Sequence, residues 1–311
     1  MDEKEAITWI ALLVPLVHLT GFLNAGHAIM RARTPQGSLG WAVALVSFPY
    51  LAIPAYWAFG SSGFKAYAAK LRELEAAYKK QIHHIAVVVR PFAAYMAQDR
   101  WGTQAFLHRM THWPLTGHND VRLLIDGQAT FDAILSAISQ AQSYVAIEFY
   151  IMRDDTLGQR LKTVLCERAR AGIHVYLLCD SIGSYYLGRE YFRDLSDAGV
   201  DCRFFTSSKG WLPARFHLNF RNHRKIVVID GREAFVGGLN VGDEYLGKDR
   251  YFGHWRDTHL TVRGPAVQGV QIAYAKDWYW MAGEIPDFNW EPEPTEGSAE
   301  VLSLETGPDS E

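Results

Sequence analysis

Two long apolar stretches begin the chain. Residues 7–23 and 39–59 contain no charged side chain, and tryptophans lie near the ends of both stretches. A helix needs about 20 apolar residues to cross a bilayer, and the first stretch reaches this length if it continues to residue 29. We therefore expect a transmembrane hairpin within residues 1–62, with spans at about 7–29 and 39–59. The alternatives are a cleaved signal peptide, disfavoured because the start lacks a basic region, and two buried core helices.

The orientation of this hairpin depends on the basic residues that flank it. Two spans place the N-terminus and the bulk of the chain on the same side of the membrane. The connecting loop carries Arg31 and Arg33, whereas several basic residues follow the second span: Lys65, Lys70, Arg72, Lys79 and Lys80. Basic residues concentrate on the cytoplasmic side. We therefore expect a multi-pass membrane protein with its main domain on the cytoplasmic side.

Beyond the hairpin the hydrophobic pattern changes twice. Residues 63–119 begin with a stretch rich in Ala, Leu, Lys and Glu, predicted as a helix over 64–90, and continue with an aromatic-rich stretch without a clear period. From residue 120 to 290, apolar strand patterns alternate with amphipathic helix patterns. The expected strands are 121–126, 144–151, 173–180, 200–205, 223–229 and 233–240, and the expected helices are 131–142, 157–172 and 189–199. This alternation predicts an α/β domain whose sheet is covered by helices on both faces.

Composition excludes several classes of protein. The chain has 311 residues, of which 49% are hydrophobic, so a substantial core is expected. A net charge of -3 gives no electrostatic argument for nucleic-acid binding, and none is expected. The three cysteines are widely spaced and include no CxxC pair, which argues against a zinc ribbon or a disulfide framework.

The stretch NHRKIVVIDGREAFVGGLN, residues 222–240, gathers polar groups at short spacings. HRKIVVI predicts a strand, Asp-Gly predicts a turn, and EAFVGGLN predicts the returning strand. Alternation places His223 and Lys225 on one face, and pairing about the turn brings Gly238 or Asn240 opposite His223. An imidazole, an ammonium and a carboxamide at one place suit an anion such as a phosphoryl group. The paired glycines predict a close approach of the substrate to the backbone.

The spacing of this stretch resembles a known signature. The pattern is H-x-K, four residues, D, six residues and GGxN, and it is filled by His223, Lys225, Asp230, Gly237, Gly238 and Asn240. It resembles the motif of the phospholipase D superfamily. The flanking text, WRDTHLTVRGPAVQ and KDWYW, and the N-terminal TPQGSLGWAVALVSFPYLAIPAYWAFG are similar to bacterial cardiolipin synthases. The resemblance covers nearly the whole chain and implies a phospholipase D-like half-domain of mixed sheet, with the phosphodiesterase motif at 217–245.

The resemblance implies a reaction that uses neither metal nor cofactor. A histidine attacks the phosphodiester of phosphatidylglycerol, and a second phosphatidylglycerol then displaces it to give cardiolipin and glycerol. His223, Lys225 and Asp230 form the catalytic motif, while Lys225, Asn240 and Gly238 bind the phosphate. Because Asp230 is expected to face away from the site, its role is assigned to the turn or strand.

Further carboxylates and histidines are candidates for supporting roles. A nucleophilic imidazole needs a group that sets its tautomer. Asp257 in the WRD sequence is expected to orient His223, and Glu148, in an apolar strand, is expected to meet a cation or a hydrogen-bond donor near the site. His217 suits either the lipid headgroup or packing. His254 and His259 are interpreted as structural histidines with satisfied hydrogen bonds.

The motif occurs once, although the superfamily builds its site from two copies. Of twelve histidines, only His223 stands two residues before a lysine. Residues 291–311 are interpreted as a linker and the start of a missing second half. Three hypotheses follow: a half enzyme that needs a separate C-terminal half with the second motif, a homodimeric phosphodiesterase in which each copy supplies one motif, and a non-catalytic membrane protein that binds phospholipids.

Overall fold

The computed structural model describes residues 3–31, 35–59, 64–95, 102, 106, 113–205 and 222–305. These residues belong to two compact units. One lies within Met1–Gly63, and the other begins at Phe64.

The N-terminal unit consists of helices. They are α1 (Glu3–Arg31), α2 (Pro35–Ser47) and α3 (Pro49–Phe59). Within the described residues, the segment Ala11–Met30 is the one helical stretch long and apolar enough to cross a membrane. The second expected span, 39–59, is not one continuous helix, because it is interrupted at Phe48. Pro49 has no N–H with which to continue the hydrogen-bond ladder there. The second membrane crossing therefore stays a prediction.

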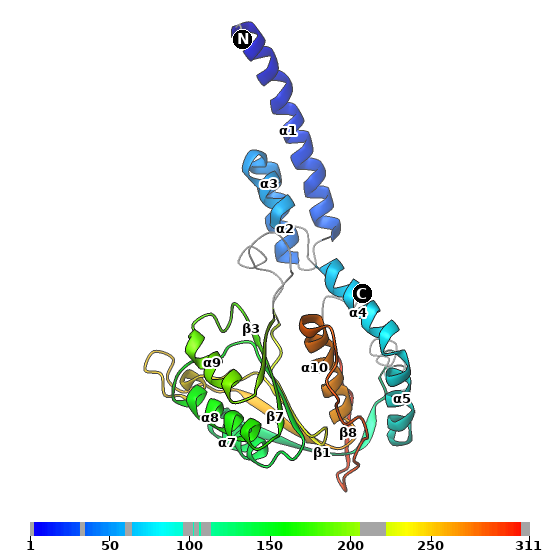
Figure 1. Cartoon of the computed structure of the whole chain (residues 1–311). Helices are drawn as coiled ribbons and strands as arrows, with labels where there is room; N and C mark the ends of the chain where they lie inside the picture. Colours follow the sequence, from blue (N-terminus) through cyan, green and yellow to red (C-terminus); the bar gives the residue numbers. More distant parts are fainter. Residues whose placement is uncertain are drawn as a thin grey trace. The chain divides into compact units, whose positions relative to one another are not determined.

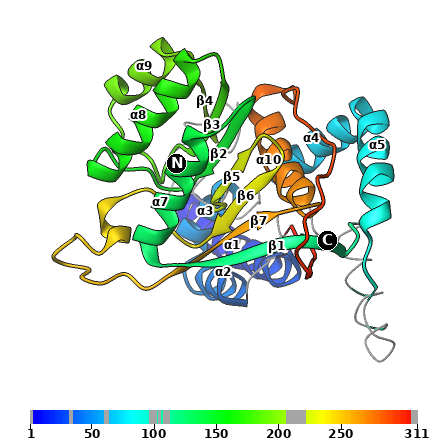
Figure 2. The ribbon, with the colours of Figure 1, turned by 90° about the horizontal axis from the view of Figure 1, so that it is seen from below.

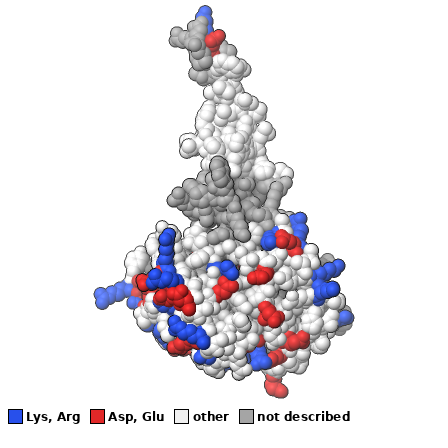
Figure 3. Space-filling model, viewed as in Figure 1, with Lys and Arg blue, Asp and Glu red and all other residues white. Residues whose placement is uncertain are grey.

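Small residues let the helices of this unit pack closely. A Cβ at Gly21 of α1 would lie 2.5 Å from the carbonyl oxygen of Leu45 and 2.9 Å from Cβ of Pro49. Large apolar side chains instead face outward, such as Phe22, which is 67% exposed, and Leu51, which is 79% exposed. Figure 3 shows a long part of this surface without charged side chains. An exposed apolar surface of this kind is typical of a membrane-embedded unit.

The larger unit is built on a mixed sheet of eight strands in the order β4-β3-β2-β5-β6-β7-β1-β8, counted over the described residues. The strands are β1 (Thr116–Ile125), β2 (Tyr144–Phe149), β3 (His174–Asp180), β4 (Asp201–Phe205), β5 (Ile226–Ile229), β6 (Glu233–Gly237), β7 (Thr258–Arg263) and β8 (Ala299–Val301). Strands β2, β3 and β4 are parallel, and the other neighbours are antiparallel. The predicted α/β architecture is confirmed.

Helices cover both faces of this sheet (Figures 1 and 2). On one face lie α7 (Asp126–Ser139), α8 (Thr156–Arg170) and α9 (Arg189–Asp197). On the other lies α10 (Val267–Ala282), against which α4 (Phe64–Ala77) packs, followed by α5 (Lys79–Val89). Alternation along β2 sends Val145, Ile147 and Phe149 into the core beneath α7 and α8. Tyr144 and Glu148 consequently point toward α10.

Several boundaries differ from those predicted, among them the start of β5, at Ile226 rather than at residue 223, and the start of α7, at Asp126 rather than at residue 131. The helix expected over 64–90 divides at Tyr78 into α4 and α5, and the first strand begins at Thr116 rather than at residue 121. Residues 299–301, predicted to belong to a linker and the start of a second half, pair with β1 as the edge strand β8. These differences arise from tertiary contacts, which local patterns do not report.

Candidate active site

The motif lies at one end of the β5–β6 hairpin. Asp230 and Gly231 form its turn, and both have positive φ angles, 54° and 70°. Because Ile226 pairs with Val236, the register carries Lys225 to the position opposite Gly237. Gly237 in turn pairs with His259 of β7. A lysine, a glycine and a histidine therefore share one row across three strands, while His223 precedes β5 by three residues.

An exposed imidazole lies on a buried ammonium at this end of the hairpin. Lys225 is 4% exposed. Its Nζ lies 3.0 Å from Nδ1 of His223 and donates to the His223 carbonyl oxygen at 2.7 Å. The Tyr150 ring, at the end of β2, lies 4.5 Å from the imidazole between ring centroids and 5.5 Å from Nζ of Lys225. Burial lowers the pKa of Lys225 to about 8, although Asp257 and Glu148 oppose the shift.

Tyr150 was not singled out by sequence reasoning. Its position in AIEFYI, beyond the last residue of a buried strand, was the available signal. The ring supplies a flat contact for the imidazole and a π-face for the ammonium. It thus contacts both side chains of the H-x-K pair.

The space above the paired glycines is occupied by the side chains of His259 in β7 and of Asp257, which directly precedes β7. A Cβ at Gly237 would lie 2.4 Å from Nδ1 of His259, and a Cβ at Gly238 would lie 2.4 Å from Oδ1 of Asp257. Substrate was expected to make this close approach. In this structure an imidazole and a carboxylate make it instead.

Gly237→Ala is expected to lower the free energy of unfolding by about 1–3 kcal/mol, because the new methyl group overlaps the His259 ring. Gly188→Ala is the matched control, since nothing lies within 4 Å of a Cβ there. Denaturant unfolding of the two variants measures the difference. Equal stability of the two variants would show that His259 moves aside without cost.

His259 is not the satisfied structural histidine that was predicted. It is 1% exposed, and neither of its ring nitrogens has a hydrogen-bond partner in the described part of the chain. Burial lowers its pKa to about 4; Asp257 acts against this shift and Lys225 adds to it. The ring is therefore uncharged at neutral pH. His254, by contrast, is exposed and lies 3.1 Å from Asp126.

The Asn240 side chain makes hydrogen bonds to two other residues of the chain. Its Oδ1 accepts from the backbone N–H of Ile151 at 3.1 Å, and its Nδ2 lies 3.1 Å from the Tyr245 hydroxyl, to which it donates. The Nδ2 group carries a second hydrogen. That hydrogen is the group through which Asn240 can contact a phosphoryl oxygen.

Asp230 lies at the far end of β5 from His223. Its carboxylate accepts from three consecutive backbone N–H groups, those of Gln142, Ser143 and Tyr144, at 2.8–2.9 Å. These contacts fasten the turn of the hairpin to the start of β2. They give Asp230 a stabilising role at a distance from the imidazole.

Asp230→Asn is expected to lower the free energy of unfolding by about 2–3 kcal/mol, because an amide N–H would face a backbone N–H that now donates to a charged oxygen. Asp132→Asn, at an exposed carboxylate on α7, serves as the control. Urea unfolding gives both values. A loss no larger than that of the control would contradict the structural role.

Two further carboxylates were expected near the histidine. Asp257 accepts from the N–H of Thr258 at 2.7 Å, and its charge acts on Lys225 and His259. Glu148 is buried and meets the side chain of Asn222, the residue before His223, on the opposite face of the sheet. His217 lies outside the described residues.

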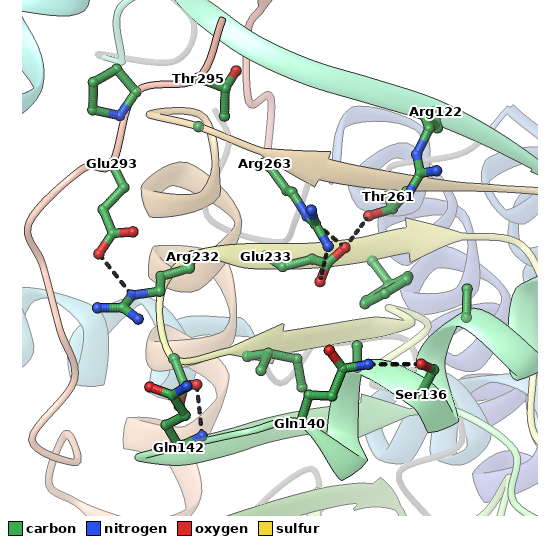
Figure 4. A pocket seen from close by; sticks show the side chains of 17 residues that line it. Arg122, Ser136, Gln140, Gln142, Arg232, Glu233, Thr261, Arg263, Glu293 and Thr295 are labelled. Carbon is green, nitrogen blue, oxygen red and sulfur yellow. Dashed lines mark hydrogen bonds and ion pairs between the residues drawn. The ribbon is translucent and has the colours of Figure 1, made fainter. Parts of the chain in front are cut away.

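A separate pocket of about 440 Å³ lies at the turn end of the hairpin, beneath α7 (Figure 4). Two of its three arginines are paired: Arg232 contacts Glu293 at 2.7 Å, and Arg263 contacts Glu233 at 3.0 Å. Arginines neutralised in this way are poor phosphate ligands. Over the described residues, no group of three metal-ligating side chains is found.

Comparison with known proteins identifies the domain. Residues 134–251 match the family model described as cardiolipin synthase, PLD-like domain. This matched region contains the motif residues from His223 to Asn240. It is similar to cardiolipin synthase A of Pseudomonas fluorescens Pf-5, with 43% identity over 88% of this chain and 57% of the relative. It is also similar to cardiolipin synthase A of Pseudomonas aeruginosa LESB58, with 41% identity over 99% of this chain and 64% of the relative.

The chain thus spans 57–64% of the length of these relatives. Among solved structures, it is similar to the phospholipase D family member Nuc from Salmonella typhimurium, with 15% identity, a TM-score of 0.38 and coverage of 52% of this chain and 96% of Nuc. It is also similar to phosphatidylserine synthase from Haemophilus influenzae, with 13% identity, a TM-score of 0.37 and coverage of 52% and 38%. Likenesses this distant carry no argument about function.

Proposed function

We propose that the chain supplies one half of a phosphatidyltransferase site that joins two phosphatidylglycerol molecules into cardiolipin and glycerol. The observation that carries this proposal is the exposed His223 imidazole resting on the buried Lys225 ammonium, 3.0 Å away. It occurs in a domain whose relatives are named cardiolipin synthase A. The substrates are lipids, and the apolar N-terminal helix is consistent with a membrane location.

In the first step, Nε2 of His223 attacks the phosphorus of phosphatidylglycerol. A bond forms between nitrogen and phosphorus, and the bond to the glycerol oxygen breaks. A general acid protonates that oxygen, so glycerol leaves and a phosphatidyl-histidine remains. Lys225 and the second Nδ2 hydrogen of Asn240 stabilise the charge on the nonbridging oxygens.

The resting hydrogen bonds must change for this attack to occur. When the Lys225 ammonium donates to Nδ1 of His223, the single proton of the neutral imidazole is on Nε2. Attack on phosphorus instead needs a lone pair on Nε2. We infer that Lys225 turns to the phosphoryl group when the lipid enters. Nδ1 then carries the proton and donates it to a carboxylate, for which Asp257 at the start of β7 is the candidate.

In the second step, a hydroxyl of another phosphatidylglycerol attacks the phosphorus. The bond to His223 breaks, a general base takes the hydroxyl proton, and cardiolipin is released. The acid and base are assigned to the histidine of a second H-x-K motif, which this sequence does not contain. That motif comes from a C-terminal half or from a second copy of the chain.

The orientation in the membrane is proposed from the distribution of basic residues around the apolar stretches. Five basic residues lie within residues 65–80, against two in the loop at residues 31–33. This bias favours a multi-pass N-terminal unit with the larger unit on the cytoplasmic side of the inner membrane.

Reconstitution in phosphatidylglycerol bilayers tests the proposed function. The chain is assayed alone and together with a C-terminal half that carries a second motif, and cardiolipin and free glycerol are quantified. Equimolar cardiolipin and glycerol from either sample supports the transferase. Phosphatidic acid and glycerol would indicate a phosphodiesterase that uses water. No product from either sample would favour a binding protein.

A further inference from the structure

The two residues that flank His223 in the sequence point away from it, into a buried acidic cluster behind the sheet. Asn222 is 7% exposed, and its Nδ2 donates to Glu148 and, at 2.8 Å, to Asp277. Its Oδ1 accepts from the backbone N–H of Arg224 at 2.9 Å, and the Arg224 guanidinium bonds to Asp277. The backbone on both sides of the imidazole is therefore held from behind.

Three carboxyl groups meet in this cluster, each at most 2% exposed: Glu148 of β2, Asp180 of β3 and Asp277 of α10. Asp180 is satisfied as a carboxylate, because it accepts from three backbone N–H groups. Asp277 is also satisfied, by Asn222, Arg224 and the Tyr67 hydroxyl at 2.9 Å.

Glu148 differs from the other two acids. Its Oε1 accepts from Asn222, but its Oε2 is buried without a hydrogen-bond donor among the described residues. The Glu148 and Asp277 carboxyls both accept from the Nδ2 group of Asn222, and Arg224 is the cation paired with Asp277. Two ionised carboxylates that share one amide donor beside a single guanidinium in a buried site are strongly disfavoured. A proton on Glu148 Oε2, shared with Asp277, removes the repulsion and gives that oxygen a hydrogen-bond partner.

We propose that Glu148 is a protonated carboxylic acid that donates to Asp277, and that this acid pair is the positioning device for His223. The positioning of His223 for catalysis, unlike the protonation of Glu148, rests on the function proposed above. The path is short: Glu148 and Asp277 hold Asn222, and Asn222 and Arg224 fix the backbone from which the imidazole projects. Loss of the proton would force the two carboxyls apart and displace both neighbours of His223.

Other groups near Glu148 do not change this assignment. Burial, followed by the charge of Asp277, raises the pKa of Glu148 well above its usual range, and Arg224 only partly offsets this. The titratable and charged groups of the described residues that face the cluster are Asp277 and Tyr274 of α10, Asp180 and Cys179 of β3, Arg224 and Lys225 before β5, Tyr67 of α4, and Glu305, which lies 4.0 Å from Arg224.

Tyr67 links the Glu148–Asp277 pair to α4, the helix that follows the N-terminal unit in the chain. Its hydroxyl donates to Oδ1 of Asp277, and its ring packs against Trp280 at 5.3 Å. Helix α4 is thereby joined to the backbone of His223 through Asp277 and Asn222. The inference assigns a positioning role to a tyrosine distant in sequence from the motif.

Infrared spectroscopy of the reconstituted full chain tests the protonation. The wild type is expected to show a carboxylic-acid carbonyl band at neutral pH that Glu148→Gln removes. Glu190→Gln, at an exposed carboxylate, should leave the band unchanged. A band absent from the wild type, or one that persists in Glu148→Gln, would overturn the assignment. This measurement does not depend on enzymatic activity, so it stands even if the proposed function fails.

Kinetics test the positioning role. Glu148→Gln, which keeps an uncharged donor, should retain kcat within about twofold. Asp277→Asn should lower kcat at least tenfold with little change in KM, and Tyr67→Phe should lower it a few-fold. If Glu148→Gln falls as far as Asp277→Asn, Glu148 acts as an anion and the proposal is wrong. Should the wild type make no product, the rate at which diethyl pyrocarbonate modifies His223, read by mass spectrometry, provides the same comparison.

Discussion

Replacement of His223 by alanine is expected to lower phosphatidyl transfer by about 10⁴-fold or more, the size of effect seen when a covalent nucleophile is removed. The imidazole is exposed, so substrate can reach it, and the buried Lys225 lies beneath it. The described histidines at the same end of the sheet cannot replace it. His259 is buried and His254 is paired with Asp126.

The measurement for His223→Ala is the initial rate of cardiolipin formation in phosphatidylglycerol bilayers, with the second motif supplied. His254→Ala is the control, because it removes another exposed imidazole of the same domain. The control should keep its rate within a few-fold. A His223→Ala rate within tenfold of wild type would show that another group is the nucleophile.

Lys225→Met is expected to lower the activity and to raise the stability. Activity should fall by about 10²–10³-fold, because the cation that stabilises the phosphoryl oxygens is lost. The free energy of unfolding should rise by about 2–3 kcal/mol at pH 7, because burial of this ammonium lowers its pKa from 10.5 to about 8. The site thus keeps a destabilising charge for its chemistry.

The difference in stability between the wild type and Lys225→Met is expected to depend on pH. Between pH 8 and 10.5 the unfolded state binds the Lys225 proton more tightly than the folded state, so wild-type stability should rise with pH across that window. Lys225→Met should lack this rise, and wild-type activity should fall as pH increases above about 8. Denaturant unfolding at several pH values measures it, with the exposed Lys248→Met as control. A destabilised Lys225→Met protein would contradict the account.

Much of the fold was predictable because its signals are local. The apolar run at residues 144–151 and the Asp-Gly turn both specified elements that the structure contains. The interruption at Pro49 and the pairing of β8 with β1 were missed. Whether a proline is tolerated, and where a short segment docks, depends on contacts with residues distant in sequence.

The site was predictable only in part, for a related reason. The spacing of H-x-K and GGxN placed the polar groups at one end of a hairpin. It could not show that His259 fills the space over Gly237, because that depends on the register between β6 and β7. Nor could it reveal Tyr150, which reaches the imidazole from β2.

The most direct test of the central claim is to trap the covalent intermediate. The full chain, with the second motif supplied, is mixed with phosphatidylglycerol vesicles, quenched in alkali within the first turnover, and digested for mass spectrometry. The account predicts a phosphatidyl group, or the glycerophosphoryl group that remains once alkali cleaves its acyl esters, on the peptide that contains His223. Its nitrogen–phosphorus bond should survive alkali and be lost in acid, and the adduct should be absent from His223→Ala. Turnover to cardiolipin without any such adduct, or an adduct on a different residue, would contradict it.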